Sequence, residues 1–75
     1  MAASRKDFCA LAAGLKAARA ATIAEYGYHP MVIAALSNAA NSHAEAVANA
    51  CAAMNPRFSR SRFLAASGHS AYPEA

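Results

Sequence analysis

The first third of the chain carries two apolar stripes at helical spacing. Bulky residues recur every three or four positions and would share one face of a helix: Phe8, Leu11, Leu15, Ala18 and Thr22. Small residues form a second stripe on the opposite side: Ala10, Ala13, Gly14 and Ala17. Ser4 is a good N-cap, and Asp7 stands where a carboxylate favours the helix dipole. The pattern predicts a helix over about 4–25.

A second helix follows a clear break. Residues 25–30 are Glu-Tyr-Gly-Tyr-His-Pro, in which Gly27 suits a left-handed position after a helix and Pro30 suits the first turn of the next one. Bulkier residues then recur at spacings of 3, 4, 3, 4, 4 and 3: Ile33, Leu36, Ala40, His43, Val47, Cys51 and Met54. Asn and Ser residues lie on the opposite arc, so the pattern predicts an amphipathic helix over about 30–54.

The last quarter of the chain predicts a short helix and a tail. Asn55-Pro56 ends the second helix, because a residue before proline is disfavoured in helical geometry. Ser59 can cap a helix over about 59–67, with Gly68 as its stop. Residues 69–75 show no periodicity, which predicts a loose tail.

Composition narrows the fold class. Alanine makes up about a third of the 75 residues, 15% are charged, and there are two cysteines and no Trp. Because alanine favours helices and disfavours strands, this composition excludes a β-sandwich, a disordered tail and a disulfide scaffold. We expect one all-α domain over 1–75, a helical hairpin of two long helices plus a short third helix. Alanine buries little area, so its stripes would pack within the chain or across a homodimer of four-helix type.

The sequence also constrains the compartment. No stretch has the roughly 20 apolar residues of a membrane-spanning helix, and Asp7 and Lys16 interrupt any apolar region of signal-peptide type. We expect a cytoplasmic protein with no membrane contact. Cys9 and Cys51 fall inside helical patterns with no further ligand at close spacing, which favours free thiols in a reducing compartment.

Residues that could carry chemistry are few. His43 and Cys51 are eight positions apart, about 80° around a helix and two turns away, so they do not form a nucleophile and base on one element. The three histidines lack the i, i+4 spacing that presents two metal ligands together. We expect a protein that is not an enzyme, with no cofactor and no metal. His43 fits a half-buried helix contact, with a pH-sensitive interface as the alternative.

Basic residues gather in two groups, and the net charge is +3. Arg57, Arg60 and Arg62 alternate with Phe58 and Phe63 near the C-terminus. In the simplest interpretation the phenylalanines anchor the third helix and the arginines are solvated. The alternatives are an acidic protein surface, or a phosphate backbone held by arginine forks and aromatic stacking. The candidate partner-binding residues are Arg57, Arg60, Arg62, Lys16 and Arg19.

Two sets of residues stand near the ends of the chain: Arg5-Lys6-Asp7-Phe8, and Asn55-Pro56-Arg57-Phe58 with Arg60, Arg62-Phe63-Leu64 and Gly68. Together these thirteen positions resemble a group of short, mostly uncharacterised proteins encoded by phages and prophages. Ser59 replaces the usual Asp of that group, which keeps a helix cap but removes a negative charge. The resemblance implies a mobile-element accessory protein in the host bacterial cytoplasm. Small phage proteins often act by occupying a site on a host protein, as anti-CRISPR proteins do.

Three functions follow in order of preference. The first is a non-enzymatic protein that binds and inhibits a host protein complex, with CRISPR-Cas defence as the specific target. The second is a small nucleic-acid-binding factor that uses Arg57, Arg60 and Arg62 on phosphates. The third is a structural homodimer whose alanine stripes pair with a second copy.

Overall fold

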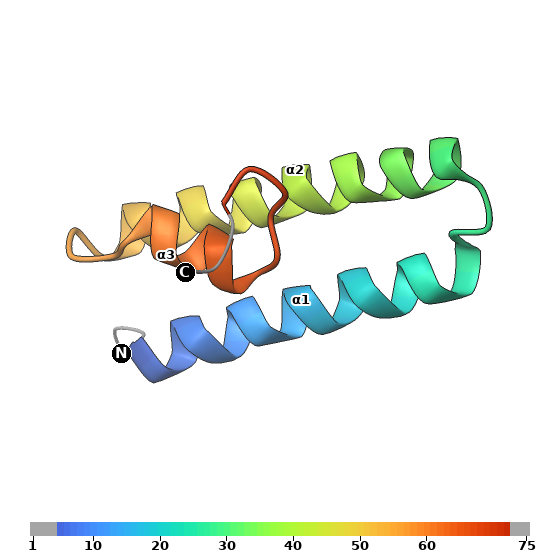
Figure 1. Cartoon of the computed structure of the whole chain (residues 1–75). Coiled ribbons are helices and arrows are strands. Elements are labelled where there is room, and N and C mark those ends of the chain that lie inside the picture. Colours follow the sequence, from blue (N-terminus) through green and yellow to red (C-terminus); the bar gives the residue numbers. More distant parts are fainter. Residues whose placement is uncertain (1–4, 73–75) are drawn as a thin grey trace.

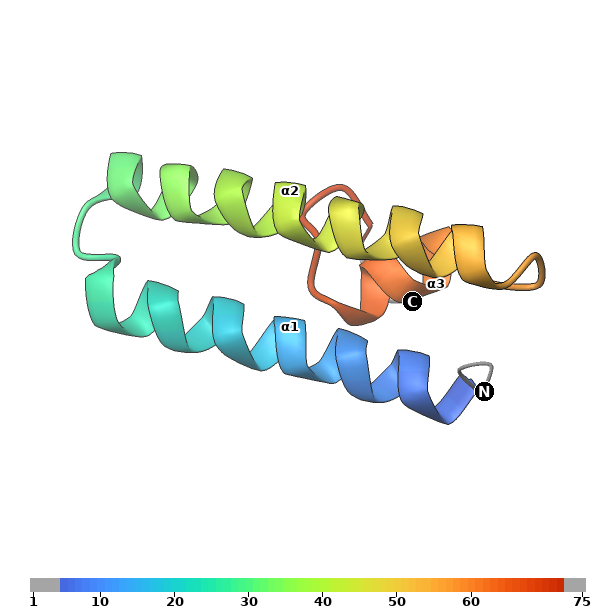
Figure 2. The same ribbon diagram turned by 180° about the vertical axis from the view of Figure 1, so that it is seen from behind.

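The computed structural model describes residues 5–72, which form three helices and no strand. Helix α1 spans Arg5–Tyr26, α2 spans Pro30–Met54 and α3 spans Arg60–Ala66. Figure 1 and, from behind, Figure 2 show α1 and α2 as an antiparallel hairpin, with α3 packed against the end where α1 begins and α2 ends. The prediction of an all-α fold is confirmed. The predicted N-cap, Ser4, lies outside the described residues.

Local side-chain contacts set the helix starts. The ring Nδ1 of His29 accepts the backbone N–H of Met31 at 3.1 Å, which makes His29 the N-cap of α2 ahead of Pro30. Ser59 Oγ accepts the N–H of Arg62 at 3.4 Å and caps α3 as predicted. These bonds satisfy amide groups that a helix leaves open at its first turn.

The glycine in the hairpin turn has a different role from the predicted one. Of the three glycines, only Gly68 adopts a left-handed backbone, with φ of 83°. A Cβ at Gly27 would lie 2.5 Å from the Ile23 carbonyl oxygen and 2.9 Å from Ile33 Cγ1. Gly27 therefore serves close approach between the end of α1 and the start of α2, and not a left-handed turn.

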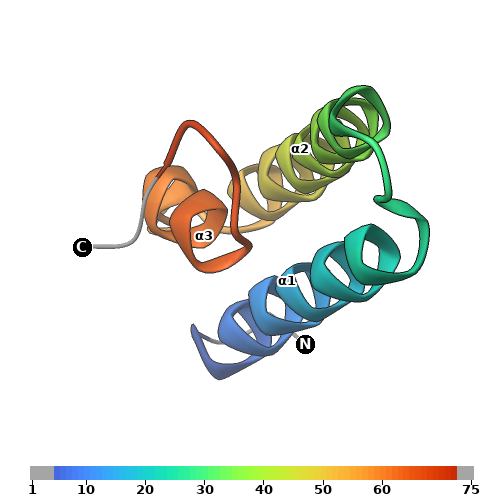
Figure 3. The same ribbon diagram turned by 45° about the vertical axis from the view of Figure 1, so that its right-hand side comes forward.

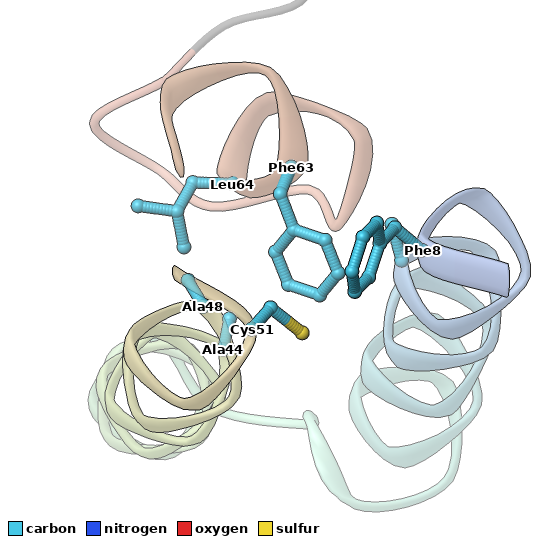
Figure 4. Close-up of a cluster of buried hydrophobic side chains, with 7 residues drawn as sticks. Phe8, Ala44, Ala48, Cys51, Phe63 and Leu64 are labelled. Carbon is cyan, nitrogen blue, oxygen red and sulfur yellow. The ribbon is translucent and has the colours of Figure 1, made fainter. Parts of the chain in front are cut away.

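The core lies where the three helices meet, at one end of the hairpin. Figure 4 shows most of its buried side chains, which are Phe8, Ala12, Ala44, Ala48, Cys51, Phe63 and Leu64. The Phe58 ring packs edge-on against Phe8, with centroids 4.9 Å apart, and is tilted against Phe63 at 5.4 Å. No residue from 13 to 43 is buried. The other half of the hairpin is therefore only two helices thick.

The segment after α3 is ordered as far as it is described. The sequence predicts a loose tail over 69–75, but residues 69–72 turn back beside α2 (Figure 3). His69 is only 7% exposed, and the Ser70 N–H donates to Asn41 Oδ1 at 3.2 Å. Polar contacts to α2 order this segment. The prediction of a loose tail relied on the absence of an apolar pattern, which gives no information about polar contacts. Residues 73–75 of the predicted tail lie outside the described residues.

Candidate functional site

A groove of about 680 Å³ opens between the N-terminal half of α1, the loop before α3, and α3 itself. Its volume falls in the range of ordinary ligand pockets, roughly 300–1,000 Å³. Its lining combines arginines, phenylalanines and small residues: Arg5, Phe8, Cys9, Ala12, Asn55, Arg57, Phe58, Ser59, Arg62, Phe63 and Ala66. The groove therefore borders directly on the aromatic part of the core.

Local geometry brings three guanidinium groups to this groove. Arg5 comes from the first turn of α1 and lies one turn before Cys9. Arg57 is positioned by a turn in which its N–H donates to Asn55 Oδ1 at 2.9 Å. Arg62 enters from the first turn of α3, whose start is fixed by the cap described above. No carboxylate is among the lining residues, so the groove is electropositive over an aromatic floor.

The structure distributes the five predicted partner-binding residues among different environments. Arg57 and Arg62 line the groove, and Arg5 joins them. Arg60 lies about 200° around α3 from Arg62. It donates from Nε to Asn49 Oδ1 at 3.0 Å and from Nη1 to the Tyr72 hydroxyl at 3.3 Å. Arg60 thus links α3 to α2 and to the C-terminal turn.

Arg19 is held within the fold and is half-buried. Its guanidinium donates to the Gly68 carbonyl, to Asn41 Oδ1 and, at 3.3 Å, to the Ser37 carbonyl. A Cβ at Gly68 would lie 3.5 Å from both Arg19 Cδ and Lys16 Cγ, so the stems of both basic residues pass beside this turn. Arg19 therefore connects α1, α2 and the segment after α3.

Arg5 is the groove residue that sequence reasoning did not include among the partner-binding candidates. The sequence does contain a pattern that could have identified Arg5. The spacing i, i+3, i+4, i+7 places on one helical face the residues Arg5, Phe8, Cys9 and Ala12. Phe8 and Ala12 on that face are buried. What the spacing cannot report is that the loop at 55–59 lies opposite this face.

The histidines and cysteines form no metal site within residues 5–72, where no three potential ligands gather. His69 Nδ1 accepts the Ala71 N–H at 3.1 Å, so the neutral ring carries its proton on Nε2. That atom is 3.4 Å from Glu45 Oε1, within ion-pair range but without a hydrogen bond. His43, expected to be half-buried, is exposed on α2. Cys51 is buried and Cys9 exposed, both as free thiols.

None of the described helices is both long enough and apolar enough to cross a membrane. What the groove offers chemically is binding, because its arginines present planar donor forks and its phenylalanines present apolar surface. Such a lining fits an anionic group that carries an apolar neighbour. No protein-family model, no curated protein and no solved structure matches this chain.

Proposed function

We propose that this is a non-enzymatic binding protein whose groove takes an acidic segment of another protein. One observation carries the proposal: three arginines from three separate segments line the same aromatic-floored groove. A segment with two or three carboxylates beside an apolar side chain matches that lining. The carboxylates would accept from the arginine forks while the apolar side chain lies on Phe58 and its neighbours.

The exposure of the arginines supports this occupant. Arg5, Arg57 and Arg62 are all exposed, so an ion pair formed with a carboxylate at the rim of the groove stays partly hydrated and costs little desolvation. Each such rim pair contributes little affinity, and together they steer an acidic surface toward the groove. The main binding energy would come from the apolar side chain that fills the space beside the phenylalanines.

The resemblance of both chain ends to short phage and prophage proteins supplies the biological setting of the proposal. We infer that the acidic segment belongs to a host protein complex in the bacterial cytoplasm, a CRISPR-Cas defence complex being the specific case. Inhibition would follow from occupancy of a surface that the complex needs. The chain would contribute no chemistry of its own to this inhibition.

A nucleic-acid partner is the second candidate, because the same arginines can hold phosphates. Three guanidinium groups neutralise about three phosphates, which predicts a slope of roughly −2 to −3 for log K against log salt. The three arginines surround one aromatic floor and do not form a line, which fits one acidic segment better than a continuous phosphate track. Self-association through the alanine stripes of the two long helices is the third candidate.

The test compares two charge reversals of equal size. Arg62→Glu changes the groove, whereas Lys6→Glu changes an exposed residue of α1 that does not line it. Tagged wild type, Arg62→Glu and Lys6→Glu are used to capture partners from a bacterial lysate. We expect one acidic protein with wild type and Lys6→Glu, and at least about a tenfold loss with Arg62→Glu.

Alkylation of Cys9 then reports occupancy of the groove directly. Cys9 lines the groove and is exposed, while Cys51 is buried and serves as the internal control. The captured partner should slow Cys9 alkylation in wild type. An unchanged alkylation rate, or equal capture by both variants, contradicts the proposal. Binding of a single-stranded oligonucleotide with the salt slope given above would favour the nucleic-acid alternative instead.

A further inference from the structure

The aromatic floor of the groove presents one ring to solvent more than the others. Phe8 and Phe63 are buried, at 7% and 5% exposure, whereas Phe58 is half-buried. Figure 4 shows Phe8 from α1 and Phe63 from α3 pointing toward one another. The Phe58 ring contacts both of them, edge-on to Phe8 and tilted against Phe63. The part of the floor that a ligand can reach is therefore mainly the outer surface of Phe58.

Phe58 is held in position by its surroundings in the free protein. Its backbone N–H donates to the Asn55 carbonyl at 3.0 Å, and the next residue, Ser59, caps α3. The two neighbouring phenylalanine rings restrict the rotation of its side chain. A contact surface that is already ordered loses little conformational entropy when a partner binds. Phe58 thus offers a rigid apolar surface on which a side chain of the partner can pack.

The geometry of this cluster favours an aromatic ligand over an aliphatic one. Aromatic rings whose centroids lie 4.5–7 Å apart attract each other beyond the gain from the area that they bury. The rings within the cluster have this spacing, at 4.9 Å between Phe8 and Phe58 and 5.4 Å between Phe58 and Phe63. A further ring on the open side of Phe58 would extend the same packing, whereas an aliphatic side chain would gain from burial alone.

The arginines at the rim favour the same ligand. A guanidinium group stacks on the face of an aromatic ring, and it has no such interaction with an aliphatic side chain. Arg57 precedes Phe58 in the loop, Arg62 belongs to α3, and Arg5 belongs to α1. Because the Phe58 ring contacts a phenylalanine from α1 and another from α3, it lies between these arginines. Carboxylates on both sides of a bound ring would therefore find arginine donors.

We infer that the acidic segment is anchored by an aromatic side chain, which packs on Phe58 and has a carboxylate on either side of it in the sequence. This inference rests on the proposed function and narrows the partner to an acidic segment that contains Phe, Tyr or Trp. The lining supplies charge complementarity, because it includes three arginines and no carboxylate. Small lining residues, Cys9, Ala12 and Ala66, leave room for a ring within the 680 Å³ of the groove.

The first test titrates isotope-labelled wild type, by nuclear magnetic resonance, with three end-blocked peptides up to millimolar concentration. Each peptide has two glutamates on either side of a central phenylalanine, cyclohexylalanine or alanine. Cyclohexylalanine keeps the size and the apolar character of phenylalanine and removes its π-system. We expect the phenylalanine peptide to bind about 2- to 10-fold more tightly than the cyclohexylalanine peptide. The alanine peptide should bind at least about tenfold more weakly than the phenylalanine peptide.

The second test removes the aromatic ring on the protein side. In Phe58→Leu the phenylalanine and cyclohexylalanine peptides should bind with nearly equal affinity, because the ring–ring interaction is lost from both. Phe58→Tyr keeps the ring and should retain the preference for phenylalanine. Both peptides are measured on the same variant, so a general change in the groove affects them equally. The comparison of the peptides on wild type does not depend on the folding of either variant.

The outcomes separate the aromatic anchor from the proposed function. Equal affinity of wild type for the phenylalanine and cyclohexylalanine peptides overturns the anchor, as does a phenylalanine preference that persists in Phe58→Leu. The proposed function survives that result if Arg62→Glu weakens both peptides and Lys6→Glu weakens neither. If none of the peptides binds, or if Arg62→Glu leaves their binding unchanged, both the proposed function and the anchor are contradicted.

Discussion

Replacement of Arg19 by methionine should destabilise the protein although Arg19 was grouped by sequence with residues that bind a partner. The guanidinium donates to the Gly68 carbonyl, the Ser37 carbonyl and Asn41 Oδ1. Methionine keeps much of the apolar stem beside Gly68 and removes all three donors. The perturbation therefore separates the hydrogen bonds of Arg19 from its packing.

The expected magnitude follows from these contacts. Hydrogen bonds from charged groups contribute about 1.5–3 kcal/mol each, and one group's bonds are not additive. Arg19 is half-buried, and Asn41 Oδ1 still accepts the Ser70 N–H after the substitution. We therefore use the lower end of the contribution per hydrogen bond and expect the free energy of unfolding to fall by about 2–3 kcal/mol in total. For a domain of this size each kcal/mol lowers Tm by about 4–8 °C, so Tm should fall by roughly 10–20 °C.

Urea unfolding followed by helical circular dichroism measures this loss at fixed protein concentration, since association would otherwise change the apparent stability. Arg62→Met is the control, because Arg62 is exposed on α3 and its loss should cost within about 0.5 kcal/mol. In a double-mutant cycle with Asn41→Ala, the two changes should couple by about 1 kcal/mol. Equal stability losses for Arg19→Met and Arg62→Met would refute the structural role of Arg19.

Three further substitutions test the fold at single positions, each by urea unfolding against wild type. Leu64→Ala should lower the free energy of unfolding by about 2–5 kcal/mol, because Leu64 is 0% exposed where α3 meets the hairpin. A loss below about 1 kcal/mol would contradict that packing. Gly27→Ala should cost about 1–3 kcal/mol because the new Cβ meets the Ile23 carbonyl at 2.5 Å, whereas Gly14→Ala, with open space around its Cβ, should stabilise α1 by up to about 1 kcal/mol. Ser59→Ala should cost about 1 kcal/mol through the lost α3 cap, and Ser59→Asp should restore it; failure of the Asp variant to do so would show that capping is not the role of Ser59.

The boundaries of the second and third helices were predictable from the sequence. The predicted helices over about 30–54 and 59–67 compare with observed bounds of Pro30–Met54 and Arg60–Ala66. Pro30, Asn55-Pro56 and the Ser59 cap act within a few residues of themselves, so the chain carries their effect locally. The phenylalanines expected to anchor α3 do pack there, with Phe63 buried and Phe58 between the rings of Phe8 and Phe63.

The sequence by itself determined the all-α fold and the places where helices begin and end, because helical hydrogen bonds and caps join residues close together in the chain. The tertiary structure determined which residues each arginine contacts. Arg19 meets Gly68, 49 positions away, and Arg60 meets Asn49, 11 positions before it. Helical spacing places a side chain on a face, but what lies opposite that face depends on how distant segments pack. For that reason only the tertiary structure shows that one groove is lined by Arg5, Arg57 and Arg62.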